Sequence, residues 1–350
     1  MVSIGVIGLG SIWEDRYRPA VGHLGHRLRV RAVFDPVVSR AEITATQQRA
    51  DAESGLLSLA RRPDIDALLL LETGWYGCEA LRLLCSAAKP IYIAADLGDE
   101  PAMLQALHWT AMNFGLTLMP ELGYRYTPAS HRLRELMATR LGSPTRIKVV
   151  VNHAFHPLAA SGDDERNVQS EQIVRRSLLH WFDWTRYVIR TSPTQVQVDA
   201  PAEESHGNEP RTSRLIRIDF ASPRMRTTNP VAEFHCVSNG RDSAETGSAG
   251  GLESGHPEIT CETGTAVIES PTVIRWKSDT NGVTEFVTES LTSDRSETVV
   301  MLDHFIRRVV GGLIPVADLA DVSRSLELLH ATRESWRSGE PVQLNAPPEM

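Results

Sequence analysis

The feature that most constrains the fold is an apolar segment at the start of the chain, followed closely by two glycines. Residues 2–7 read Val-Ser-Ile-Gly-Val-Ile, and Gly8 and Gly10 stand two apart before a segment with helical character. A strand, a glycine turn and a helix in this order are typical of the opening unit of a dinucleotide-binding fold. Gly8 permits the tight turn. Gly10 lacks the Cβ that would keep a diphosphate from the helix N-terminal amides of Ser11 and Ile12.

The third position of the glycine pattern departs from the usual sequence. Trp13 stands where a third glycine would allow close packing of the helix on the strand. The indole either fills the space beneath the diphosphate or packs against the sheet. The prediction for the cofactor therefore rests on Gly8, Gly10, Ser11 and Ile12, and the role of Trp13 stays open.

An acidic residue follows at about the distance at which dinucleotide folds place their ribose ligand. Residues 28–35 read Leu-Arg-Val-Arg-Ala-Val-Phe-Asp, a second strand that ends in Asp35. A carboxylate at this place accepts hydrogen bonds from both ribose hydroxyls and repels a 2′-phosphate, which favours NAD over NADP. The alternative is that Asp35 is a turn residue before Pro36.

Strands and helices alternate through residues 1–122, which predicts a doubly wound α/β Rossmann domain. The apolar run at residues 65–71 is typical of a central parallel strand that is covered on both faces. The other expected strands are residues 90–95 and 116–120, and the expected helices are residues 14–26, 40–52, 55–62, 77–87 and 101–114.

Residues 123–345 have a different pattern, with many short segments that alternate polar and apolar side chains. This pattern predicts an α+β domain with a large, mostly antiparallel open sheet that has one wet face. Residues 199–211 and 239–255 are polar and are expected to be loops. The expected strands are residues 146–153, 194–198, 214–220, 231–238, 258–262, 265–269, 273–277 and 284–291, and the expected helices are residues 129–139, 172–190, 297–310 and 316–338, of which the terminal two can pack back on the first domain.

Charge and cysteine content exclude several classes of partner. The 350 residues carry 36 Lys and Arg against 44 Asp and Glu, a net charge of −8, with no long basic cluster. We therefore expect neither nucleic acid nor a membrane as partner, and a small-molecule substrate instead. The longest apolar run is too short to span a bilayer. The four cysteines are scattered, which favours reduced thiols in a soluble, cytoplasmic protein.

One expected helix, residues 172–190, carries a group of functional side chains. Arg176, His180, Asp183 and Tyr187 fall on one face, spaced so that neighbours adjoin. Either this face is solvated, or it lines a site in which Asp183 orients His180 and the imidazole passes a proton. One His and one Asp lack the further ligands that a catalytic zinc needs, so no metal site is predicted. The opposite arc is apolar and predicts a buried stripe, formed by Val174, Leu178, Trp181, Phe182, Thr185 and Ile189.

The order of these features resembles the Gfo/Idh/MocA oxidoreductases, the family of glucose–fructose oxidoreductase and inositol dehydrogenase. The resemblance covers nearly the whole chain and includes Gly8-Leu9-Gly10 and Asp35 at the NAD(P) positions. Its most specific part is the ending, which is similar to the family's closing "A…ES…sGxpV" helix. Further motifs that carry it are Asp64-Ile65-Asp66-Ala67, Ala88-Lys89-Pro90-Ile91, Arg125-Tyr126-Thr127-Pro128 with Leu141-Gly142-Ser143-Pro144, and Ala317-Asp318 through Glu334-Ser335-Trp336 to Pro341-Val342.

Three departures from the family pattern concern the expected active site. Residues 94–96, Ala-Ala-Asp, replace the family's E-K-P, whose lysine lies beside nicotinamide and substrate oxygen. Arg176 replaces the acidic companion of the family histidine, here His180, which favours neutral imidazole. Residues 72–77 lack the family's usual His or Asn. Candidates to replace the lysine are Tyr124, Arg125, Lys148 and His153.

The resemblance implies an NAD-dependent oxidoreductase acting on a sugar, polyol or related hydroxy compound. In this hypothesis His180 transfers a proton with Asp183 beside it, and Arg125 or Arg176 grips the substrate. The missing lysine leaves an alternative, a catalytically silent member that binds a nucleotide or sugar as a sensor or regulator. The resemblance also implies a homodimer or homotetramer formed through the second domain's sheet.

Overall fold

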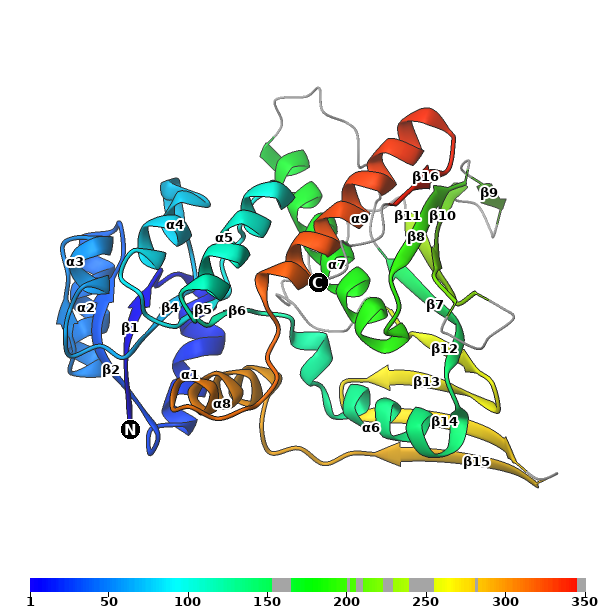
Figure 1. Cartoon of the computed structure of the whole chain (residues 1–350), viewed down its shortest axis with the longest axis horizontal. Coiled ribbons are helices and arrows are strands. Elements are labelled where there is room, and N and C mark those ends of the chain that lie inside the picture. The colour runs from blue at the N-terminus through cyan, green and yellow to red at the C-terminus, as the bar shows by residue number, and fades with distance from the viewer. Residues whose placement is uncertain are drawn as a thin grey trace. The chain divides into compact units, whose positions relative to one another are not determined.

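The computed structural model describes residues 1–152, 165–199, 202–205, 210–222, 229–238, 255–280 and 283–344. Contacts between Cα atoms divide the chain into two units (Figure 1). Unit 1 consists of Met1–Gly123 and Asp294–Leu326, and unit 2 consists of Tyr124–Ser293 and Glu327–Met350. Unit 1 is thus built from two separate stretches of sequence. No helix in the described part of the chain is long and apolar enough to cross a membrane.

Unit 1 contains a six-stranded sheet in which every pairing is parallel. The strand order is β3-β2-β1-β4-β5-β6, so the order reverses beside the first strand, where doubly wound sheets bind ligands. The Rossmann-type architecture predicted from the sequence is confirmed. The strands are β1 (Val2–Ile7), β2 (Leu28–Phe34), β3 (Asp51–Ala52), β4 (Ala67–Leu70), β5 (Ile91–Ile93) and β6 (Leu118–Pro120).

The helices of unit 1 agree with the predicted ones except at one end of the second. Residues 51 and 52 form β3 and pair with Ala32 and Val33, whereas the sequence predicted that they end a helix. The physical reason is Arg49, whose φ of 53° stops α2 in a left-handed turn. The helices are η1 (Trp13–Tyr17), α1 (Arg18–His23), α2 (Val38–Gln48), α3 (Leu56–Ala60), η2 (Gly74–Tyr76), α4 (Glu79–Cys85), α5 (Pro101–Asn113) and α8 (Glu297–Val309).

The first helix begins with a π-helical segment, which the sequence did not predict. The amide of Arg18 donates to the carbonyl of Trp13, five residues back. Pro19 follows in the first turn of α1 and has no N–H to donate. The wide turn therefore lets one continuous helical segment contain a proline.

The late helix α8 belongs to unit 1 and packs beside α1 (Figure 1). Arg27 forms an ion pair with Asp303, whose side chain is 5% exposed. The ring of Tyr92 on β5 meets Phe305 edge to face at 5.7 Å, and its hydroxyl lies 3.6 Å from the sulfur of Met301. The core of unit 1 thus includes residues from the end of the chain.

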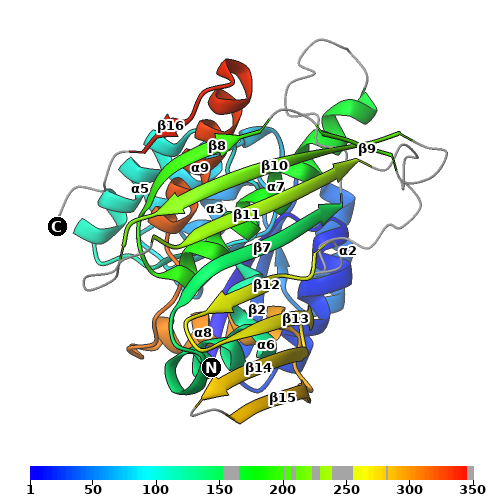
Figure 2. The same cartoon turned by 90° about the vertical axis from the view of Figure 1, so that its right-hand side faces the viewer.

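Unit 2 is built on a ten-stranded sheet, which Figure 2 shows face on. The order is β15-β14-β13-β12-β7-β11-β10-β8-β16, with β9 paired to β10, and β7 with β11 is the parallel pair. The mostly antiparallel sheet is as predicted. The strands are β7 (Pro144–Asn152), β8 (Pro193–Val198), β9 (Ala202–Ser205), β10 (Pro210–Phe220), β11 (Val231–Ser238), β12 (Glu258–Cys261), β13 (Gly264–Ser270), β14 (Val273–Thr280), β15 (Val283–Ser290) and β16 (Val342–Gln343).

The predicted loop at residues 199–211 is wrong in part. Residues 202–205 form β9, which pairs with the start of β10 over residues 210–213. The segment is polar and short, so no apolar alternation indicated a strand, and backbone pairing alone defines it. Most of the second predicted loop, at residues 239–255, lies outside the described residues.

The helices of unit 2 cover the apolar face of its sheet. Phe182 on the long helix meets Phe234 on β11 edge to face at 5.1 Å, and the predicted stripe of residues 174–189 is buried. Strand β7 alternates accordingly, with Ile147 and Val149 buried and Arg146 exposed on the outer face. The helices are α6 (Pro128–Leu136), η4 (Met137–Leu141), α7 (Glu165–Ile189) and, in part, α9 (Leu319–Ser338), with η3 (Gly123–Tyr126) before them.

Candidate functional site

The glycine loop of unit 1 lies at the carboxyl end of β1. Gly8 has a φ of +87°, and its amide donates to the carbonyl of Phe34 at 3.0 Å. A Cβ on Gly8 would lie 2.5 Å from the backbone nitrogen of Glu72, which follows β4. Gly8 is therefore required both by its left-handed backbone and by the close approach of the neighbouring chain.

The second glycine lies at the start of the first helix. The amide of Glu14 donates to the carbonyl of Gly10 at 3.2 Å, so the helix starts with Ser11, which is exposed, and Ile12, which is half-buried. A Cβ on Gly10 would collide with the carboxylate of Glu72. The backbone thus forms the cradle expected for a diphosphate at a helix N-terminus, and a carboxylate lies against it.

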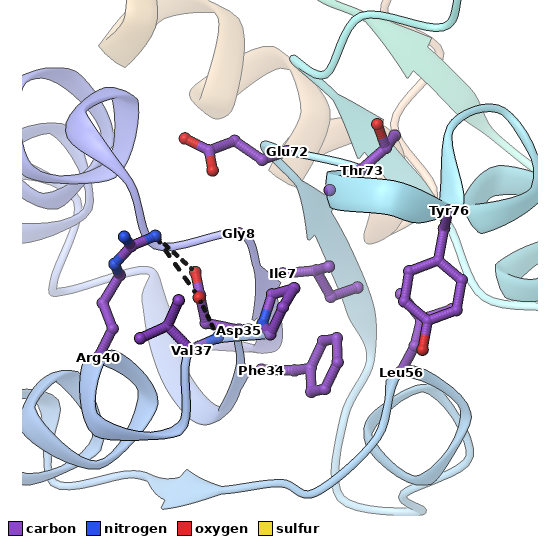
Figure 3. Close-up of a pocket in the computed structure, with 12 residues that line it drawn as sticks. Ile7, Gly8, Phe34, Asp35, Val37, Arg40, Leu56, Glu72, Thr73 and Tyr76 are labelled. Carbon is purple, nitrogen blue, oxygen red and sulfur yellow. Dashed lines mark hydrogen bonds and ion pairs between the residues drawn. The ribbon is translucent and has the colours of Figure 1, made fainter.

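Asp35 is held at the end of β2 by hydrogen bonds to both of its oxygens. Oδ2 accepts from the amide of Leu9 at 2.8 Å, and Oδ1 accepts from the amide of Val37 at 2.8 Å. Arg40 on α2 lies 3.3 Å from Oδ2, and Asp35 is 3% exposed (Figure 3). The bond to Leu9 joins this carboxylate directly to the glycine loop. The bond to Val37 also gives Asp35 the turn role that the sequence left as an alternative.

A pocket opens between the ends of β1, β2 and β4 and the start of α2. Arg40 and Tyr76 lie on opposite sides of it (Figure 3), and the ring of Tyr76 stacks on Trp75 at 3.8 Å between centroids. Its apolar walls suit a flat base, and its polar groups lie beside the glycine loop. The lining residues are Ile7, Gly8, Phe34, Asp35, Pro36, Val37, Arg40, Leu56, Glu72, Thr73, Gly74 and Tyr76.

Glu72 is a residue of the site that the sequence interpretation did not select. Burial raises the pKa of its carboxyl group, the nearby Asp35 raises it further, and Arg40 opposes both. The signal in the sequence is a carboxylate just after an apolar run, and it becomes informative once β4 is known to pair with β1, because parallel neighbours end at the same edge of a sheet. The pocket and the glycine cradle fit an adenine dinucleotide, whereas the carboxylates of Glu72 and Asp35 oppose its negative charge.

Trp13 is fully buried and does not line this pocket. Its Nε1 is buried without a hydrogen-bond partner among the described residues. Of the two roles left open by the sequence, packing in the interior agrees with this burial. The indole therefore gives no reason against a ligand on the glycine loop.

In unit 2, Arg125 and Asp183 form a buried ion pair. The Nε of Arg125 donates to Oδ2 of Asp183 at 2.7 Å, a second guanidinium nitrogen reaches Oδ1, and Arg186 lies 3.9 Å from Oδ1. The two side chains of the pair are 13% and 2% exposed. Two arginines therefore contact Asp183, which stands three residues after His180 on α7, and its expected role toward His180 stays a prediction.

His180 lies on the same helix, beside an aromatic cluster. Its ring is 5.4 Å from that of Tyr124, which also contacts Trp181 at 4.6 Å. His180 is half-buried, and Arg176, one turn earlier, is exposed. The helix α7 therefore brings His180, Asp183 and Arg176 onto one element, and η3 adds Tyr124 and Arg125 to the same cluster.

Of the other two candidates for the missing lysine, Lys148 lies in the described part of the chain and is not in this cluster. Lys148 alternates with the buried Ile147 and Val149, so it is on the outer face of the sheet. His153 lies outside the described residues. Asp96, in the family's lysine segment, accepts a hydrogen bond from the amide of Gly98 at 2.9 Å and stabilises a turn.

The described residues contain no group of three or more His, Cys, Asp or Glu that could hold a metal ion. The four cysteines are free thiols, two of them buried.

A parallel sheet with a glycine loop and an acidic strand end defines the class of dinucleotide-binding Rossmann folds.

Comparison with solved structures shows the same architecture over the whole chain. No family model matches the sequence, and no curated protein sequence matches it. The structure is similar to an NAD binding oxidoreductase from Klebsiella pneumoniae, with a TM-score of 0.76 and 15% identity over 99% of this chain and 100% of that one. It is similar to levoglucosan dehydrogenase in complex with NADH and levoglucosan, with a TM-score of 0.75 and 15% identity over 98% and 99%.

A third similar structure is UDP-N-acetylglucosamine 3-dehydrogenase GnnA from Acidithiobacillus ferrooxidans. Its TM-score is 0.70, with 17% identity over 95% of this chain and 97% of that chain. These likenesses show the fold, a Rossmann-type unit joined to a unit with a large, mostly antiparallel sheet. This chain therefore has the two-domain fold on which these oxidoreductases are built.

Proposed function

We propose that the chain is an NAD(P)-dependent oxidoreductase of the Gfo/Idh/MocA type that acts on a sugar, a polyol or a related hydroxy compound. The observation that carries the proposal is the glycine cradle at the end of β1, joined through the Leu9 amide to Asp35 at the end of β2. This is the geometry that binds the diphosphate and ribose of a dinucleotide. The similar structures include enzymes that act on a sugar nucleotide and an anhydrosugar, which supports the substrate class.

In this reaction a hydride passes from a substrate C–H bond to the nicotinamide, and the hydroxyl proton passes to a base. We assign His180 as that base, because it is half-buried beside Tyr124 and imidazole titrates near neutral pH. Arg125 is engaged by Asp183, so its role is to fix the end of η3 on α7. Arg176 is exposed on α7, and we assign it to bind an anionic group of the substrate.

We favour NAD over NADP, because a carboxylate at the position of Asp35 repels a 2′-phosphate. Arg40 works against this preference, since its guanidinium lies 3.3 Å from Asp35 and its side chain is 44% exposed. Titrations with NADH and with NADPH therefore test the two residues together. We expect tighter binding of NADH, and Arg40→Ala should widen the difference.

The first experiment follows tryptophan fluorescence during titration with NADH, with Asp35→Ala as a second sample. Saturable quenching that weakens by about tenfold or more in Asp35→Ala supports the proposal. The absence of saturable binding, together with no nucleotide released from the denatured protein, would remove it. Asp66→Ala is a matched control, because this carboxylate binds the Ser3 amide away from the pocket.

A second function is a catalytically silent protein that binds nucleotide or sugar and acts as a sensor or regulator. The observation in its favour is the segment Ala94-Ala95-Asp96, which offers no ammonium group. A dehydrogenase screen over sugars, polyols and hydroxy acids at several pH values separates the two functions. Turnover that falls roughly 10²- to 10⁴-fold in His180→Ala, at unchanged NADH affinity, supports the enzyme.

A further inference from the structure

The carboxylate of Glu72 is fixed beside the glycine loop by the backbone that carries it. The pairing of β4 with β1 continues past the strand end, where the amides of Leu71 and Glu72 point to the carbonyl of Ile7 at 2.9 and 3.4 Å. A Cβ on Gly8 would lie 2.6 Å from the Cβ of Glu72, which leaves this backbone no room to approach further. Only the side chain beyond Cβ can adjust, and its carboxylate faces Gly10.

The charges around this carboxylate do not balance a diphosphate. Asp35 adds a second carboxylate at the end of β2, and Arg40 on α2 contributes one guanidinium, which already binds Asp35. The helix N-terminus contributes the equivalent of about half a positive charge. A diphosphate with two negative charges would therefore meet a net negative site while Glu72 is ionised.

Protonation of Glu72 changes both the charge and the hydrogen-bonding chemistry of the loop. A neutral carboxyl group carries an O–H that donates, whereas the ionised group only accepts. Beside Gly10, such a donor would add to the backbone amides that face a phosphate oxygen. We propose that the glycine loop binds a diphosphate only with Glu72 protonated, so that a protein in which Glu72 is ionised takes up one proton at this residue with each dinucleotide bound.

This inference rests on the proposed dinucleotide function and sets the direction of its pH dependence. The pKa of Glu72 is already raised by burial and by Asp35, with Arg40 opposing, and a bound diphosphate raises it further. The affinity for the dinucleotide is therefore greatest at pH values below the pKa that Glu72 has in the free protein. It falls as pH rises through that pKa, because an increasing fraction of the protein must first take up a proton.

The test is calorimetric titration with NAD⁺ at pH 5.5 and pH 8.5 on the wild type, Glu72→Gln and Glu79→Gln. The diphosphate of NAD⁺ stays ionised throughout this range. We expect the wild type to bind at least about tenfold more weakly at pH 8.5, the effect of one unit of pKa difference. Glu72→Gln should bind equally at both pH values and at least about tenfold more tightly than the wild type at pH 8.5.

Glu79→Gln is the matched control, since it removes the same charge from an exposed position on α4, and it should behave as the wild type. A second measurement uses the wild type alone. Titration in two buffers of different ionisation enthalpy should show uptake of about one proton per NAD⁺ at pH values above the pKa of Glu72. This measurement holds even if Glu72→Gln does not fold.

Two results overturn the inference, and they differ in what else they overturn. If the wild type binds NAD⁺ equally at both pH values without proton uptake, Glu72 does not control the loop and the proposed function stands. If no variant binds NAD⁺ at either pH, the proposed function fails as well. Binding by Glu72→Gln with none by the wild type at pH 8.5 supports the inference in its strongest form.

Discussion

Gly8 and Gly10 both face Glu72, but they face different parts of it. A methyl group on Gly8 would meet the backbone of Glu72 between 2.5 and 2.9 Å, and the φ of +87° is strained for any side chain. A methyl group on Gly10 would meet the carboxylate, the far end of a flexible side chain. The two glycines therefore serve different purposes, the first in folding and the second in ligand approach.

We expect Gly8→Ala to lower the free energy of unfolding by about 1–3 kcal/mol from backbone strain alone, with additional loss from the collision. Gly10→Ala should cost less stability but should abolish dinucleotide binding, because the methyl group fills the diphosphate's approach to the amides. Thermal melts and NADH titrations of both variants check this. Equal melting temperatures for the two would contradict the assignment.

The buried pair of Arg125 and Asp183 makes a second prediction at this scale. Asp183→Asn removes the counter-charge of Arg125 and of Arg186, and it should destabilise unit 2 by about 3–5 kcal/mol. The double variant Asp183→Asn with Arg125→Met should recover part of this loss, because it also removes the guanidinium that lost its carboxylate. Urea denaturation of the single variants and the double variant gives the coupling energy of the pair. Glu269→Gln, in an exposed pair with Arg275, should cost about 1 kcal/mol or less.

The residues of the site were predictable to different degrees. Gly8, Gly10 and Asp35 stand in a known spacing, and the structure places all three at one edge of the sheet. Glu72 was missed because a carboxylate after an apolar run has no meaning until the neighbouring strand is known. The partner of Asp183 was likewise unpredictable, since Arg125 is distant in sequence and helix periodicity reports only neighbours on the same helix.

Among the elements, α6 offers a simple test of how much a helix N-cap contributes to stability. Thr127 precedes it, and its side-chain oxygen accepts from the amide of Ser130 at 3.2 Å. Ser130 in turn accepts from the indole of Trp184 at 2.8 Å, so the cap is tied to α7. The start of this helix is therefore fixed both within the chain and by packing.

Thr127→Ala should lower the free energy of unfolding by about 0.5–2 kcal/mol, because the amide of Ser130 loses its partner at a buried site. Thr127→Ser keeps the hydroxyl and should retain most of the stability. Chemical denaturation of the three proteins gives the comparison. A loss in the serine variant as large as that in the alanine variant would show that the cap bond is not responsible.

Which elements could be predicted follows from what stabilises each one. The central strands β1 and β4 were evident because burial on both faces demands continuous apolar sequence. The strands β3, β9 and β16 are short and largely polar, and they are defined by backbone pairing with longer neighbours. The π-helical turn at η1 was missed because Pro19 indicates a break in hydrogen bonding without specifying how the turn widens.

At the scale of the whole molecule, we expect self-association through the sheet of unit 2, because an open sheet with alternating faces leaves one apolar side to cover. The outer face of this sheet is polar. Arg146 pairs with Glu233, and Arg217 lies 3.1 Å from Asp219. The expected apolar side of the sheet is the one that packs on α7, as the contact of Phe182 with Phe234 shows. Any interface on the outer face would therefore be formed largely by charged side chains.

We predict a homodimer or homotetramer at micromolar concentration, measured by light scattering. Because the face is charged, the assembly should dissociate as ionic strength rises, and Arg146→Glu should weaken it by placing two like charges beside each other. A monomer at low salt would contradict the prediction. An assembly that neither salt nor Arg146→Glu affects would locate the interface elsewhere.

Because α8 lies late in the sequence and packs in unit 1, it also determines when this unit can fold during synthesis. On the ribosome, residues 1–123 emerge long before Asp303 and Phe305, so until α8 emerges Arg27 lacks the carboxylate of Asp303 and Tyr92 lacks the ring of Phe305. An N-terminal domain normally folds first as the chain emerges. Here the nascent sheet stays incompletely covered until α8 has also left the exit tunnel.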